Sequence, residues 1–204
     1  MIPVESCIGV FVKIFVLLTP FFILSVFISM TGEMEPLQRR ALAKRTTVAI
    51  WVICMVIYLF GERIFHYLGI TPEAFQAGTG VLLLLSGIEL VRGTSTSSIR
   101  SSCGSNDIAV VPLAIPYTVG PGTVGTLLVM GATASDWKMR GIELAGITAA
   151  VLLIGLLLIF CERMEAILKK QGLEILTKLT GLFLAALAAQ LILSALRTII
   201  HTAS

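Results

Sequence analysis

The sequence predicts an all-α integral membrane protein of six transmembrane helices, arranged as two inverted three-helix repeats with broken first and fourth helices. Three observations support this fold class. Hydrophobic residues make up 56% of the 204 residues and charged residues only 13%, whereas soluble domains carry about 25% charged residues. Six apolar segments approach or exceed the length of about 20 residues that crosses a bilayer. Short motifs also recur, in the same order, in the two halves of the chain.

The six expected spans follow from the apolar segments, and their ends are approximate. The second is the weakest, because its apolar stretch Val48–Phe60 is short and must borrow residues from Ala41–Ala43 or from around Ile64. The N-terminus MIPVES has no basic region, so the first segment is interpreted as a retained span rather than a signal peptide. Nothing between the spans is long enough for a soluble domain, which predicts a single membrane domain, residues 1–204. The expected spans are 7–30, 44–61, 72–92, 108–133, 141–160 and 177–199.

The two predicted repeats cover about 7–92 and about 107–199, and they are joined by the Ser/Thr/Gly-rich linker 93–106, GTSTSSIRSSCGSN. Matching motifs lie 96 to 101 residues apart: Thr19-Pro20 with Ile115-Pro116, Phe60-Gly61-Glu62-Arg63 with Phe160-Cys161-Glu162-Arg163, Thr79-Gly80 with Thr180-Gly181, and Glu89 with Gln190. Because each repeat crosses the membrane three times, the second must enter from the opposite face. Inverted repeats of this kind are a recurring plan of secondary transporters, which bind substrate near the midplane at broken helices.

The stretch 115–123, IPYTVGPGT, interrupts the fourth apolar segment with two prolines and two glycines. Prolines remove helical hydrogen bonds, and the backbone groups that they free cannot stay unsatisfied in hydrocarbon. The break should therefore be buried in protein or line a wet cavity. A new half-helix beginning near Pro121 would direct its positive end toward the break, where a carboxylate is stabilised.

The candidate substrate-binding residues are those of the two breaks and their neighbours. The alternative is that the prolines and glycines only kink membrane helices, which tolerate them. The first-tier residues are Thr19, Pro20, Ser25, Pro116, Thr118, Gly120, Pro121, Gly122 and Thr123. The second-tier residues are Gln76, Thr79, Glu89, Thr180 and Gln190.

The sequence predicts structural roles for the charged residues inside or beside the spans. Lys13 can extend its ammonium to the membrane interface, and Glu143 suits the positive end of the fifth span. Glu89 can pair with Arg92 one turn away. No carboxylate is then expected at bilayer depth, and no proton-relay residue is named.

The orientation of the spans follows from the lysines and arginines. Ten of them fall in the three loops opposite the termini, and the side of the termini carries Arg63, Lys138, Arg140 and Arg197. The positive-inside rule then predicts that both termini are extracytoplasmic.

Several function classes are excluded or disfavoured. The net charge of +3 and the scattered bases argue against nucleic-acid binding. The four cysteines are far apart without a CxxC motif, so neither a metal site nor another cofactor is expected. No HExxH, GxSxG or Walker motif is present, so no catalytic residue is assigned and the protein is not expected to be an enzyme.

The stretches VVPLAIPYTVGPGTV, LGITPEAFQAGTGVLLLL and LTGLFL resemble the MarC-type family of bacterial and archaeal inner-membrane proteins, sometimes called the neutral amino acid transporter family. The resemblance covers nearly the whole chain, and IPxxxGPG is its most specific part. It implies a multi-pass protein of the inner (plasma) membrane with inverted repeats. For some members it also implies transport of small neutral amino acids.

Two functions from different classes therefore stay open. The first is a membrane transporter or exporter of small neutral solutes, with the lipid bilayer and a small-molecule substrate as its partners. The second is a non-transporting membrane partner or assembly protein, in which the breaks serve packing. The sequence leaves a homo-oligomer open.

Overall fold

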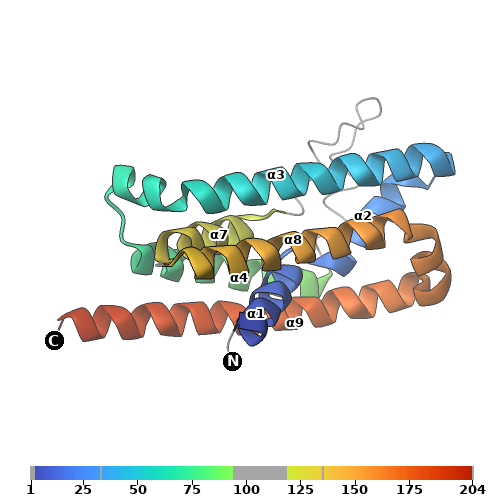
Figure 1. Cartoon of the computed structure of the whole chain (residues 1–204). Helices are drawn as coiled ribbons and strands as arrows, with labels where there is room; N and C mark the ends of the chain where they lie inside the picture. Colours follow the sequence, from blue (N-terminus) through green and yellow to red (C-terminus); the bar gives the residue numbers. More distant parts are fainter. Residues whose placement is uncertain (1–2, 33, 94–118, 135, 204) are drawn as a thin grey trace.

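The structure is a computed structural model, and it describes residues 3–32, 34–93, 119–134 and 136–203. Within these ranges the chain forms helices with short connections and no strand, which confirms the all-α class for this part of the protein. Figure 1 shows the arrangement. The helices are α1 (Pro3–Leu17), α2 (Pro20–Thr31), α3 (Pro36–Leu68), α4 (Pro72–Arg92), α7 (Pro121–Thr133), α8 (Trp137–Ile159) and α9 (Cys161–Ala203).

Prolines and glycines set most of the helix boundaries. The helices α2, α3, α4 and α7 each have a proline in the first turn, where the missing amide would have had no partner within the helix. Gly69 and Gly93 end α3 and α4 with φ of 63° and 74°, a conformation that favours glycine. The hydroxyl of Thr71 accepts from the amide of Ala74 at 3.3 Å and caps α4.

Four helices are long and apolar enough to cross a membrane, over Pro36–Gly61, Pro72–Arg92, Trp137–Ile159 and Gln171–Thr198. The helices α1 and α2 form a fifth candidate that is bent by 41° at a short break. The shorter α7 is also apolar, and the remainder of the predicted fourth span, 108–118, lies outside the described residues. Thus four or five of the six expected spans are found, and the second begins at Pro36 rather than near 44 because polar residues extend its helix.

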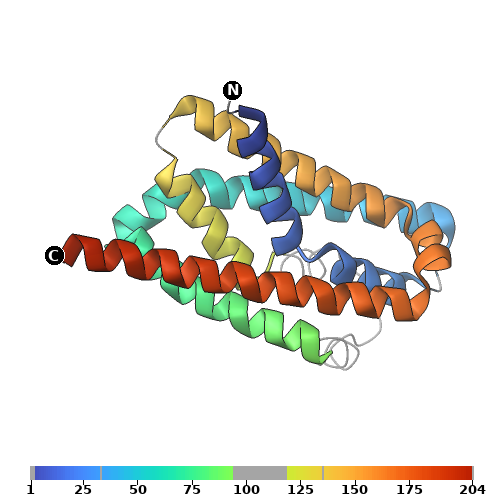
Figure 2. The ribbon, with the colours of Figure 1, turned by 90° about the horizontal axis from the view of Figure 1, so that it is seen from below.

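The long helices run in alternating directions (Figures 1 and 2). The helix α3 is antiparallel to α8, and α4 is antiparallel to α9, with each pair in contact. The short helices α2 and α7 leave the middle of the molecule toward opposite ends (Figure 2). The helix α2 packs on α8 and α9, whereas α7 packs on α3 and α4. Each half therefore lays its short helix against the two long helices of the other half.

Small residues allow α4 and α9 to approach closely. A side-chain carbon built at Gly87 would lie 2.8 Å from the carbonyl oxygen of Gly181 and 3.0 Å from the amide of Ala185. Gly181 and Ala185 are four residues apart and therefore lie on the same face of α9. Close backbone approach of this kind is a common means of helix association in membranes.

Arg39 is buried, although it is one of the ten basic residues that the sequence predicts in the loops opposite the termini. Its Nη2 and Nε atoms donate to the carbonyl oxygen of Thr31 at 2.7 and 3.2 Å. Its Nη1 atom also lies 3.8 Å from Oε1 of Glu162 at the start of α9. The guanidinium thus satisfies the carbonyl end of α2, where a cation also complements the helix dipole.

Candidate functional site

The first helix break lies between Leu17 and Pro20. Thr19 has φ 47° and ψ 61° and is the only non-glycine residue with positive φ in the part of the chain that the structure describes. A left-handed conformation costs a residue with a side chain roughly 1–2 kcal/mol. The amide of Thr19 donates to the carbonyl of Val16 at 3.0 Å, and Pro20 has no amide to continue the helix. The carbonyl of Leu17 therefore needs a partner from elsewhere in the fold.

The second break, at Gly120 and Pro121, supplies that partner. Gly120 is extended, with φ −67° and ψ 170°, and α7 begins directly after it. The hydroxyl of Thr123, in the first turn of α7, donates to the carbonyl oxygen of Leu17 at 3.0 Å. Thr123 is 2% exposed. The two breaks, which are far apart in the sequence, thus meet inside the protein.

The glycines beside the second break differ in their surroundings. A side-chain carbon built at Gly120 meets nothing within 4 Å, so this residue faces open space. One built at Gly122 would lie 3.1 Å from Cβ of Leu83 on α4, and Gly125 packs in the same way against Thr79. The structure therefore gives Gly122 and Thr79 a role in packing α7 against α4, although the sequence suggested that Gly122 leaves room for a solute.

The other sequence-predicted residues are dispersed. Pro116 and Thr118 lie outside the described residues. Ser25 is half-buried on α2, and Glu89 is exposed on α4. Thr180 donates to the carbonyl of Leu176 in its own helix, and it lines a small cavity of about 130 Å³ with Pro20.

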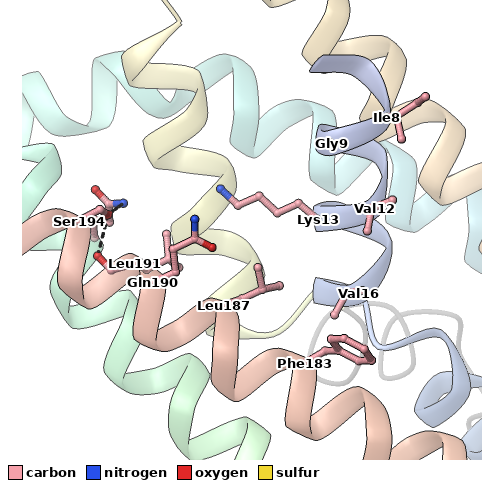
Figure 3. Close-up of a pocket in the computed structure, with 11 residues that line it drawn as sticks. Ile8, Gly9, Val12, Lys13, Val16, Phe183, Leu187, Gln190, Leu191 and Ser194 are labelled. Carbon is pink, nitrogen blue, oxygen red and sulfur yellow. Dashed lines mark hydrogen bonds between the residues drawn. The ribbon is translucent and has the colours of Figure 1, made fainter. Parts of the chain in front are cut away.

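A larger cavity of about 580 Å³ lies between α1, α4 and α9, and it contains the second-tier residues Gln76 and Gln190 (Figure 3). Nε2 of Gln76 donates to Oγ of Ser194 at 2.9 Å, and that hydroxyl donates to the carbonyl of Leu191 at 3.0 Å. Val16 also lines the cavity, so the cavity adjoins the last turn of α1 and hence the first break. Its lining is Ile8, Gly9, Val12, Lys13, Val16, Gln76, Phe183, Leu187, Gln190, Leu191 and Ser194.

Lys13 extends into this cavity from α1 and points toward Gln190 on α9 (Figure 3). The sequence-based interpretation, in which the side chain reaches the membrane interface, is therefore not what the structure shows. The difference arises from helix packing, because Lys13 lies on the face of α1 that points toward α9.

Glu143 is the polar residue that the sequence interpretation missed. It is 7% exposed within the span of α8, and Oε2 accepts a hydrogen bond from the Tyr58 hydroxyl of α3 at 2.5 Å. Lys13 and Arg140 also act on it electrostatically. The sequence placed Glu143 at a helix start, but α8 begins at Trp137 and the carboxyl group lies beyond the first turn. A carboxyl group within a span is a functional-site candidate by default.

No group of three or more His, Cys, Asp or Glu side chains that could hold a metal ion occurs among the described residues.

Comparison with known proteins gives one family over almost the full length. The family model described as "MarC family integral membrane protein" matches residues 4–200. A UPF0056 membrane protein of Methanocaldococcus jannaschii is 33% identical over 192 residues, which cover 92% of this chain and 94% of that protein. One of Aquifex aeolicus is 28% identical over 201 residues (93% and 92%), and one of Archaeoglobus fulgidus is 26% identical over 191 residues (91% and 90%). No solved structure matches the chain.

The bond between the breaks gives a first testable prediction. Thr123→Val should lower the free energy of unfolding by about 1–3 kcal/mol, because it leaves the buried Leu17 carbonyl without its donor. Thr123→Ser should retain most of the stability. Thr133→Val is the matched control, since the hydroxyl of Thr133 bonds only within its own helix. Denaturant titration in detergent measures all three, and an equal loss for Thr123→Val and Thr133→Val would contradict the assignment.

A second prediction concerns Tyr58 and Glu143. A double-mutant cycle with Tyr58→Phe and Glu143→Gln should give a coupling energy of about 1.5–3 kcal/mol, the range of hydrogen bonds to charged groups. The exposed pair of Lys178 and Glu174, 2.9 Å apart, is the control and should couple by less than about 0.5 kcal/mol. Equal coupling in the two pairs would show that burial adds nothing to the Tyr58 bond.

Proposed function

The chain belongs to the MarC family of integral membrane proteins, and we propose that it is a transporter or exporter of small neutral solutes, with small neutral amino acids as the substrate class. The proposal assigns it to the inner (plasma) membrane and gives it no catalytic role. The substrate would bind at the helix breaks of Thr19 and Gly120, the first of which lies within one turn of the cavity-lining residue Val16.

The observation that carries the proposal is the hydrogen bond from Thr123 to the Leu17 carbonyl, next to a cavity with polar groups. Irregular backbone at membrane depth is tolerated only where protein or a water-filled cavity satisfies it. Transporters place such breaks at their substrate sites. Gly120 faces open space, so a solute could approach the backbone there.

The directions of the helices support an inverted repeat. The pairs α3 with α8 and α4 with α9 run antiparallel, and α2 and α7 leave the centre in opposite directions (Figure 2). An axis in the membrane plane would relate the halves in this way. Exchange between two arrangements of the halves could then expose the cavity alternately to the two sides.

The second candidate is a non-transporting membrane partner or assembly protein. The observation in its favour is that Gly122 packs against Leu83, and Thr123 against the end of α1. Both contacts would be needed for folding even in a protein that transports no solute.

Transport in proteoliposomes distinguishes the two candidates. We expect purified protein to exchange labelled alanine across the bilayer. Gly120→Leu should reduce the rate roughly tenfold or more, because the new side chain occupies the open space at the break without meeting other atoms. Gly141→Leu is the matched control, since it is also unobstructed but lies on α8 away from the breaks, and it should transport at nearly the native rate.

Two results would contradict the transporter proposal. One is the absence of exchange for alanine, glycine and serine with correctly folded wild-type protein. The other is native exchange by Gly120→Leu. Either would favour the partner or assembly role.

The proposed orientation has both termini outside the cytoplasm. The starts of α3 and α9 and the end of α4 lie near one end of the helix bundle, and the end of α3 and the start of α8 lie near the other (Figure 1). By their positions in these helices, Arg39, Arg163 and Arg92 belong to the first group, and Arg63 and Lys138 to the second. Alkaline phosphatase fused after Ser204 should be active, and green fluorescent protein at the same position should be dark. The reverse pair of readouts would place the C-terminus in the cytoplasm.

A further inference from the structure

The cavity between α1, α4 and α9 carries one cation and no carboxylate among its lining residues. Glu143 of α8 acts on Lys13 electrostatically, but Lys13 forms no hydrogen bond or ion pair with any residue in the described part of the chain. Its ammonium points across the cavity toward Gln190 (Figure 3). An ammonium within a membrane span is costly unless an anion or hydrogen-bond acceptors compensate it, so the cavity is complementary to an anionic group.

The remaining polar groups of the cavity lie on the two helices that face Lys13. Gln190 is on α9, and Gln76 of α4 is held by its bond to Ser194. Amide groups can both donate to a carboxylate and accept from an ammonium group. One end of the cavity is therefore equipped for a small charged head group.

The rest of the lining is apolar. Val16, Leu187 and Leu191 lie deeper, whereas Ile8, Val12 and Phe183 are 56%, 48% and 55% exposed and form the rim. The volume of about 580 Å³ lies in the range in which proteins bind ligands much larger than glycine. A ligand without an apolar part would leave most of this surface uncovered.

We propose that this cavity binds carboxylates that bear an apolar tail, such as the branched chain of leucine, with the carboxylate on Lys13 and the tail against α1 and α9. The inference deepens the proposed function and rests on it for the role of the cavity. It changes the expected preference within the neutral amino acids from small side chains, such as that of alanine, toward larger apolar side chains.

Alternative ligands fit the same surface less well. A cationic amphiphile would be repelled by Lys13, and a neutral hydrocarbon would leave the ammonium without a hydrogen-bond acceptor in an apolar setting. Glycine would satisfy Lys13 but would cover little of the apolar wall, which contributes about 25 cal/mol per Å² of surface removed from water.

Binding to the full-length protein tests the inference without any need for transport. The protein is placed in phosphatidylcholine nanodiscs, and calorimetric titrations use leucine, isocaproate, isopentylamine and glycine as probes. Isocaproate keeps the tail and the carboxylate but lacks the ammonium group, and isopentylamine keeps the tail but lacks the carboxylate. We expect leucine and isocaproate to bind. Glycine should bind more weakly by a factor of roughly ten or more, and isopentylamine should not bind.

Three variants locate the site. Lys13→Met keeps the length of the side chain without its charge and should weaken isocaproate binding roughly tenfold or more, whereas Lys13→Arg should preserve it. Gln190→Glu is nearly isosteric at an exposed position, so folding should be unaffected. It would pair with Lys13 and repel carboxylates, and it should also abolish binding.

The outcomes separate this inference from the proposed function. Binding of isocaproate but not leucine would support the carboxylate site and indicate a ligand without an amino group, which would count against amino acids as the transported class. Equal binding of isopentylamine and isocaproate, or unchanged isocaproate binding in folded Lys13→Met and Gln190→Glu, would overturn the inference even if alanine exchange were observed.

Discussion

The hydrogen bond from the Thr123 hydroxyl to the Leu17 carbonyl is the interaction on which the rest of the arrangement depends. A helix that breaks within a membrane exposes backbone groups that hydrocarbon cannot satisfy. Thr19 holds the break in a left-handed turn, and the end of α1 must therefore contact the start of α7. This contact brings the two halves together at their interruptions and leaves the last turns of α1, with Lys13, beside the cavity.

Other polar contacts also join the halves. Side-chain hydrogen bonds in the described part of the chain connect residues of 3–93 with residues of 119–203, among them Trp51 to Thr148, Tyr58 to Glu143, Gln76 to Ser194, and Thr123 to Leu17. The bonds of Tyr58 and Thr123 are buried, and in a low-dielectric interior such bonds are costly to leave unmade. The two halves are therefore interleaved, with α2 and α7 each packed on the long helices of the opposite half. A rearrangement that opens the cavity would have to exchange some of these bonds for others or for water.

The sequence was informative where the signal is local. Apolar length predicted α4 at its observed bounds, and the prolines predicted the starts of α2 and α7. It was misleading for Arg39, Lys13 and Glu143, because a charged residue near the end of an apolar segment looks the same whether it faces water or a neighbouring helix. A four-residue spacing in Glu143, Ile147 and Val151, all of them buried, is the signal that could have shown that Glu143 faces inward. The partner Tyr58, 85 positions away, has no such local signature.

By itself the sequence determined that the chain is a helical membrane protein, where four or five of its spans lie, and that helices are interrupted before Pro20 and Pro121. These properties depend on hydrophobicity and backbone donors that each residue carries wherever it is placed. Only the tertiary structure decided which groups satisfy the breaks, that Gly122 packs against Leu83 while Gly120 stays open, and that Lys13 faces a cavity with Gln190. Such contacts depend on the rotation and crossing of helices, which are set by packing between residues distant in sequence.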